Sequence, residues 1–176
     1  AIFRPFHMHV QLIGFMCAGK SRVGRELAEV LGMPFVDLDR VIEQRVGPIK
    51  PFFEQEGEAA FRKVEAEVLG EVLGGSGAVI AMGGGTPMER DNRDRMMQAG
   101  KVIWLDVPID VLMPRIERAG GDRPLLAGLK GEALRDRVGS LLLERTPTYR
   151  AAHHRIDATG KPREIAETIA QVLQLR

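Results

Sequence analysis

GFMCAGKS, residues 14–21, is the most informative stretch of the chain, because it places small residues, a lysine and a hydroxyl directly after an apolar run. It matches G-x-x-x-x-G-K-[ST], a phosphate-binding loop that needs a strand before it and a helix after it. The apolar run 10–13 supplies the strand, and apolar residues at helical spacing follow Ser21. Gly14 and Gly19 allow backbone N–H groups to converge on a polyphosphate. We therefore predict that the chain binds a nucleotide.

The loop also predicts roles for the two residues that end it. The helix that starts near Lys20 adds the positive end of its dipole to the site. We expect Lys20 to reach the β- and γ-phosphates and Ser21 to ligate the Mg²⁺ that bridges them. The alternative is a plain glycine turn with Lys20 on the surface and Ser21 as a helix N-cap. Cys17 is better explained as a small filler than as a redox group.

Composition excludes several kinds of partner. The 176 residues carry a formal charge of +1, with 25 basic and 24 acidic residues and no block of one sign, which argues against nucleic acid. No apolar segment reaches the roughly 20 residues that cross a bilayer, so we expect no membrane partner. One cysteine excludes an internal disulfide and favours the cytoplasm. The beginning, AIFRPFHMH, lacks an initiator Met and an apolar leader and is expected to be a trimmed start.

Strand-like and helical segments alternate along the chain. Strands are predicted over 9–15, 34–37, 78–82, 101–106 and 154–157, with amphipathic helical patterns between them and at the C-terminal end. Such alternation predicts an α/β fold with a parallel sheet flanked by helices on both faces, as a single domain over 1–176. GGDRPLLAGLKG, residues 120–131, interrupts the pattern with Gly and Pro and is predicted to be a mobile loop.

Two carboxylates follow the second predicted strand in FVDLDRVIEQ, residues 35–44. Residues two apart in a strand share a face, so Asp37 and Asp39 are both expected to face the cleft at the end of the sheet. One could hold the metal ion through water, and the other could orient and deprotonate an acceptor hydroxyl. The alternative is that Asp39 only N-caps a helix beginning at Arg40.

Two further segments suggest an acceptor site. Phe61 and Arg62 could present an apolar wall and a planar cation to a small ringed acid, although a core position for Phe61 and a solvated Arg62 are the ordinary explanation. The glycines 83–85 follow a buried strand, and their entropic cost suggests close approach of a ligand or of another backbone segment. A loose turn before Pro87 is the alternative.

The ordered set of these motifs resembles the shikimate kinase family. It consists of the phosphate-binding loop, D-x-D, G-E-x-x-F-R, G-G-G, R-P-L-L and R-x-P-x-Y, from about Val10 to the C-terminal helix. The resemblance implies a three-layer P-loop NTPase fold of nucleoside-monophosphate-kinase type, with a five-stranded parallel sheet. It also implies an acceptor-binding region at about 37–63 and a lid at about 120–130.

The resemblance further implies the activity, phosphorylation of the 3-hydroxyl of shikimate by ATP with Mg²⁺, and the residues that serve it. Asp39, Lys20 and Arg123 are the implied catalytic residues, and Ser21 and Asp37 the metal ligands. The implied acceptor site comprises Asp39, Phe61, Arg62, Gly83, Gly84, Gly85 and Arg145. The implied nucleotide site comprises Gly14, Cys17, Ala18, Gly19, Lys20, Ser21, Arg22, Arg118, Arg123, Lys161 and Pro162.

Arg22 departs from the family pattern, which usually has a small hydroxyl residue there, and it is expected to point away from the phosphates. The lid segment is also a little short for the family. Two other functions stay open: a related kinase, such as a gluconate kinase, and a sensory domain that binds the ligand without catalysis. The latter would be expected to lose Asp39, Asp37 or Arg123, all of which are present. We expect a monomer.

Overall fold

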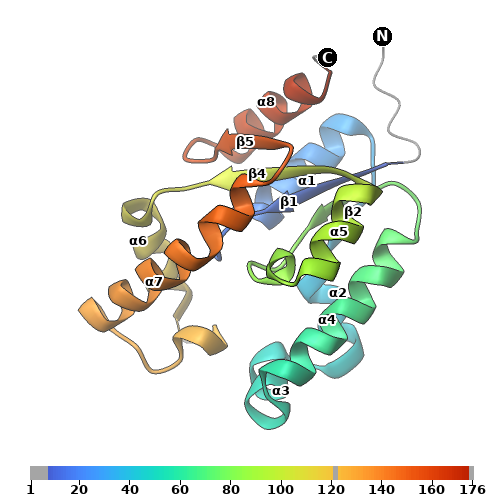
Figure 1. Ribbon diagram of the computed structural model, residues 1–176. Helices are drawn as coiled ribbons and strands as arrows, with labels where there is room; N and C mark the ends of the chain where they lie inside the picture. The colour runs from blue at the N-terminus through green and yellow to red at the C-terminus, as the bar shows by residue number, and fades with distance from the viewer. Residues whose placement is uncertain (1–7, 121–122, 175–176) are drawn as a thin grey trace.

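A computed structural model describes residues 8–120 and 123–174 of the chain; residues 1–7, most of the segment expected to be a trimmed start, and residues 121–122 of the predicted lid lie outside them. The described residues form one five-stranded parallel sheet flanked by helices, which confirms the predicted fold class (Figure 1). The strands are β1 (His9–Ile13), β2 (Phe35–Asp37), β3 (Val79–Ala81), β4 (Gly100–Asp106) and β5 (His154–Asp157). The helices are α1 (Lys20–Leu31), α2 (Leu38–Val46), α3 (Ile49–Glu56), α4 (Glu58–Leu73), α5 (Arg90–Ala99), α6 (Ile109–Ala119), α7 (Gly131–Arg150) and α8 (Pro162–Gln174), with 3-10 turns η1 (Thr86–Met88) and η3 (Pro124–Leu126).

The order of the strands, β2-β3-β1-β4-β5, determines which sequence motifs meet. Parallel pairing sets Leu12 opposite Ala81, and Ala81 opposite Asp37. The carboxyl ends of β1, β3 and β2 therefore lie next to one another at one edge of the sheet. The phosphate-binding loop, the triple glycine and the two aspartates follow these three strands. Ligands of open α/β sheets bind at this edge.

Different helices pack against the two faces of the sheet. Gln11 pairs with Val102 and Ile13 with Trp104, so these four side chains share a face. Gln11 Nε2 donates to the Met96 carbonyl of α5, 2.8 Å away, which places α5 on that face. Figure 1 shows α1 and α8 together on the opposite side. The sheet is thus the middle of three layers, as expected.

The ends of the elements differ from the sequence prediction at one functionally important place. β2 ends at Asp37 and α2 begins at once with Leu38, so Asp39 lies in the first turn of a helix and not on a strand. The Asp37 side chain caps this helix by accepting from the Arg40 amide. Both the strand argument for Asp39 and the alternative that it caps a helix starting at Arg40 are therefore wrong. No helix among the described residues is long and apolar enough to cross a membrane.

Candidate active site

The phosphate-binding loop holds the Lys20 ammonium by its own backbone. Lys20 Nζ donates to the carbonyl oxygens of Gly14, at 2.6 Å, and Phe15, at 2.9 Å. Burial lowers the pKa of Lys20 to about 8, and the attraction of Asp39 offsets only part of this effect. An anion bound at the loop would favour the charged form of Lys20, so its position suits a phosphate.

Ser21 and Asp37 form the pair expected to hold the metal ion. Ser21 Oγ donates to Asp37 Oδ2 across 2.7 Å. A hydroxyl and a carboxylate oxygen are the hard donors that Mg²⁺ prefers. Within residues 8–120 and 123–174 no group of three or more His, Cys, Asp and Glu side chains could hold a metal. The pair therefore fits a Mg²⁺ whose other ligands are phosphate oxygens and water, as is usual for this ion.

Asp39 reaches the cleft from α2 instead of from a strand. Burial raises the pKa of its carboxyl to about 6, and the negative charges of Asp37 and Glu65 act in the same direction. The positive charges of Lys20 and Arg123 reduce the effect. A general base works best when its pKa is close to the operating pH. Asp39 is therefore suited to accept a proton in this cleft.

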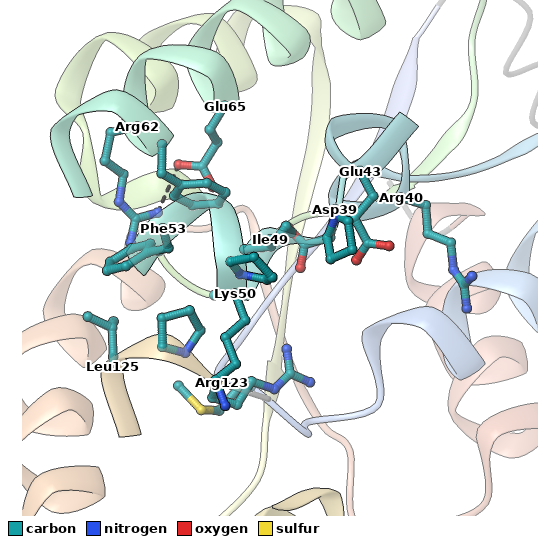
Figure 2. A pocket seen from close by; sticks show the side chains of 18 of the residues that line it. Asp39, Arg40, Glu43, Ile49, Lys50, Phe53, Arg62, Glu65, Arg123 and Leu125 are labelled. Carbon is teal, nitrogen blue, oxygen red and sulfur yellow. Dashed lines mark hydrogen bonds and ion pairs between the residues drawn. The ribbon is translucent and has the colours of Figure 1, made fainter. Parts of the chain in front are cut away.

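The predicted acceptor residues meet in one cavity of about 730 Å³ (Figure 2). Helix α2 contributes Asp39, α4 contributes Arg62, and α7 contributes Arg145. Arg123, predicted to cover the nucleotide phosphates, also lines this cavity. The predicted residues on its wall are Asp39, Phe61, Arg62, Gly83, Gly84, Gly85, Arg123 and Arg145. The fold thus brings together residues that are far apart in the sequence.

Arg62 is oriented by a carboxylate that sequence reasoning missed. Arg62 Nη1 donates to Glu65 Oε1 at 2.9 Å, and the Thr86 hydroxyl donates to Glu65 Oε2 at 2.9 Å. Glu65 is 1% exposed, so both of its oxygens find partners inside the protein. The Arg62 guanidinium also lies over the Phe61 ring, 5.2 Å from its centre. The i, i+3 spacing of Arg62 and Glu65 on a helix was a usable signal.

Arg145 is a buried cation of the cavity, with 5% of its surface exposed, whereas Arg62 is half-buried. A Cβ on Gly84 would lie 3.0 Å from Arg145 Nη1, which explains why the loop has a glycine at this position. Tyr149, the last residue of the R-x-P-x-Y motif, had no predicted role; it donates its hydroxyl to the Gly84 carbonyl at 2.5 Å. Burial raises the pKa of Tyr149 to about 12, which keeps this hydroxyl a donor. The glycine loop is thereby fixed against α7.

The predicted nucleotide residues line a separate cavity of about 540 Å³ beside the phosphate-binding loop. They come from the loop, from α6 and from the region where α8 begins: Cys17, Ala18, Gly19, Arg22, Arg118, Lys161 and Pro162. Arg22 lines this cavity, in agreement with its predicted place in the nucleotide site. Gly14, Lys20 and Ser21 do not line it, and Arg115, which no motif indicated, does.

Comparison with known proteins places the chain among small-molecule kinases. The family model described as shikimate kinase matches residues 16–174. A shikimate kinase of Salinibacter ruber is 41% identical over 97% of this chain and 87% of its own length. A shikimate kinase of Gloeobacter violaceus is 46% identical over 94% of this chain and 92% of its own length.

Solved structures of shikimate kinases are also similar to this chain. Shikimate kinase from Acinetobacter baumannii, in complex with shikimate, superposes with a TM-score of 0.89 and 38% identity, covering 95% of this chain and 93% of that one. A gluconokinase from Sinorhizobium meliloti reaches a TM-score of 0.67 at 18% identity, covering 97% of this chain and 94% of that one. The second likeness concerns the fold alone.

Proposed function

The chain belongs to the shikimate kinase family, and on that premise we propose which of its residues transfer the phosphoryl group from ATP to the 3-hydroxyl of shikimate. The protein is a small-molecule kinase that phosphorylates shikimate with ATP, a step of aromatic amino acid (chorismate) biosynthesis. In the transfer an oxygen–phosphorus bond forms at the acceptor, the bond between the γ-phosphorus and the bridging oxygen breaks, and ADP leaves.

On the acceptor side, Arg62 and Arg145 bind the carboxylate of shikimate and Asp39 accepts the proton of the attacking hydroxyl. Two guanidinium groups from different helices give a carboxylate a directional grip. Glu65 holds Arg62 in place for this contact. The pKa of Asp39, raised to about 6, leaves the carboxyl largely ionised near neutral pH and still basic enough to take a proton.

On the nucleotide side, Lys20 and Arg123 neutralise the phosphate oxygens, and the loop amides around Gly19 bind them. Ser21 and Asp37 hold Mg²⁺, which supplies charge neutralisation at the β- and γ-phosphates when it is bound. The remaining predicted residues of the 540 Å³ cavity contact the nucleoside. We also propose that the protein acts in the cytoplasm as a monomeric single-domain enzyme.

The observation that best supports this assignment is that Asp39, Arg62, Arg145 and Arg123 line one cavity. A base, a pair of carboxylate-binding cations and a phosphate-binding cation are the groups that this reaction needs together. The negative charge of Asp39 also raises the pKa of Lys20, which supports a role for Asp39 near the phosphate-binding loop.

A coupled ADP-release assay tests the proposal. Shikimate should support turnover, whereas gluconate and a reaction without acceptor should give only background ADP. Asp39→Asn should lower kcat by at least about a hundredfold while the Kd for ATP changes less than about threefold, because the variant loses a base and not a nucleotide contact. Equal turnover with gluconate would change the acceptor assignment, and unchanged kcat in Asp39→Asn would remove Asp39 from the role of base.

A further inference from the structure

The phosphate-binding loop contains a residue in an unfavourable backbone conformation. Ala18 N donates to the Phe15 carbonyl at 3.1 Å, which closes a turn with Cys17 as its third residue. The φ angle of Cys17 is 63°, and among the described residues no other non-glycine residue has a positive φ. The third position of a turn with positive φ favours glycine, because a Cβ is disfavoured there. A contact from another part of the chain would therefore help to stabilise this turn.

That help comes from Arg115, which lies 98 positions along the chain on α6. Its Nη1 donates to the carbonyl oxygen of Cys17 at 3.1 Å. None of the ion pairs among the described residues involves Arg115. Hydrogen bonds from a charged donor are stronger than those between neutral groups. Arg115 thus binds the loop at the residue whose conformation is least favourable.

The contact also matters for how the loop faces its ligand. Lys20 holds the carbonyls of Gly14 and Phe15, and Arg115 holds that of Cys17. Three carbonyl oxygens of the loop are therefore occupied by cations. A loop that binds phosphate must present amide N–H groups and keep its carbonyl oxygens away from the anion. Rotation of the peptide after Cys17 would take its oxygen away from Arg115 and break the hydrogen bond from Ala18 N to the Phe15 carbonyl that closes the turn.

We propose that Arg115 is a positioning residue for ATP: its hydrogen bond to the Cys17 carbonyl keeps the phosphate-binding loop in the conformation that Cys17 by itself disfavours. The proposal rests on the proposed function only in taking ATP as the ligand of the loop. Arg115 also lines the nucleotide cavity, so direct contact with the nucleotide is the competing explanation. The two explanations predict different results when residue 17 is glycine, because glycine adopts a φ near 63° without strain. If Arg115 acts by holding the loop, it should then matter less for ATP binding; if it contacts the nucleotide, it should matter equally.

A double-mutant cycle separates them, with the Kd for Mg·ATP measured by isothermal titration calorimetry without acceptor. We expect Arg115→Ala to weaken binding about tenfold, the effect of losing one charge-assisted hydrogen bond. Measured against Cys17→Gly alone, whatever the Kd of that variant, adding Arg115→Ala should weaken binding less than about threefold. A full tenfold loss in both backgrounds would assign Arg115 to direct nucleotide contact and overturn the proposal, as would an unchanged Kd in Arg115→Ala.

Arg118→Ala is the matched control, because Arg118 lies one helical turn further on α6 and lines the same cavity but donates to Pro114 and not to the loop. Its effect on the Kd should be the same with cysteine and with glycine at position 17. In turnover, Arg115→Ala should raise the KM for ATP and leave the KM for shikimate unchanged, a split that general loss of structure would not produce. If Arg115→Ala does not fold, Arg115→Lys is used in the same double-mutant cycle. Arg115→Lys should weaken ATP binding when residue 17 is cysteine, and adding Cys17→Gly should restore it. If Cys17→Gly does not restore binding, the proposal is wrong. A protein that binds ATP but does not phosphorylate shikimate would refute the proposed function and leave this test intact.

Discussion

Replacing Asp39 by asparagine should make the protein more stable at neutral pH while it removes the proposed base. The ionised carboxyl of Asp39 is held in a partly buried cleft next to two other acidic groups, and this raises its pKa from 3.8 to about 6. The folded protein therefore carries an unfavourable charge that the unfolded chain does not feel. Asparagine has nearly the same shape without this charge, so the substitution removes the penalty.

The size and sign of the effect follow from linkage. A rise in pKa from 3.8 to about 6 corresponds to about 3 kcal/mol at most, and partial exposure of Asp39 to solvent reduces the expected gain to about 1–2 kcal/mol. Between pH 4 and 6 the folded state binds more protons than the unfolded state, so the stability of the wild type falls as pH rises. The gain in Asp39→Asn should be absent below about pH 4, grow up to about pH 6 and stay constant above it.

Urea unfolding of the ligand-free protein at pH 4, 6 and 8 measures this difference. With an m-value of about 2 kcal/mol/M, the midpoint for Asp39→Asn at pH 8 should lie about 0.5–1 M above that of the wild type. Glu43→Gln is the matched control, because Glu43 lies one turn later on α2 and lines the same cavity but is exposed. Its free energy of unfolding should differ from that of the wild type by less than about 0.5 kcal/mol, as is usual for a surface substitution.

The reasoning is refuted if Asp39→Asn is no more stable than the wild type at pH 8, or if its gain is the same at pH 4 and pH 8. The first result would mean that attraction from Lys20 and Arg123 outweighs burial. The second would mean that the gain does not come from the charge of the carboxyl.

Three further predictions concern activity and packing. The kcat/KM for ATP should be bell-shaped in pH, rising through about 6 as Asp39 ionises and falling above about 8 as Lys20 of the nucleotide-free enzyme loses its proton; a flat profile from pH 5 to 9 would contradict both assignments. Gly85→Ala would set a Cβ 2.6 Å from Arg62 Nη2, so the KM for shikimate should rise about tenfold or more while that for ATP stays constant in steady-state kinetics. Tyr149→Phe leaves a loop carbonyl without its donor and should lower the free energy of unfolding by about 1–3 kcal/mol in urea titrations, an effect that Leu143→Ala on the exposed face of the same helix should not show.

Local patterns predicted some of the site correctly and failed where an element boundary was needed. The alternation of apolar segments indicated the parallel sheet, because strand and helix periods are properties of neighbouring residues. The boundary between β2 and α2 was placed wrongly, since Asp37 acts both as the last strand residue and as the helix cap. Asp39 faces the cleft even so, because the first turn of α2 begins directly at the edge of the sheet. The conclusion held although its geometric reason did not.

What the residues determine by themselves is the phosphate-binding loop, because all of its parts lie within eight consecutive positions and need only a strand before and a helix after. Resemblance to a family added the acceptor residues, but not the contacts that hold them. Tertiary structure alone brings the Arg115 guanidinium to the Cys17 carbonyl across 98 positions, and the Tyr149 hydroxyl to the triple glycine across 65. It alone also raises the pKa of Asp39 and lowers that of Lys20, since burial and the charges of distant residues exist only when the chain is folded.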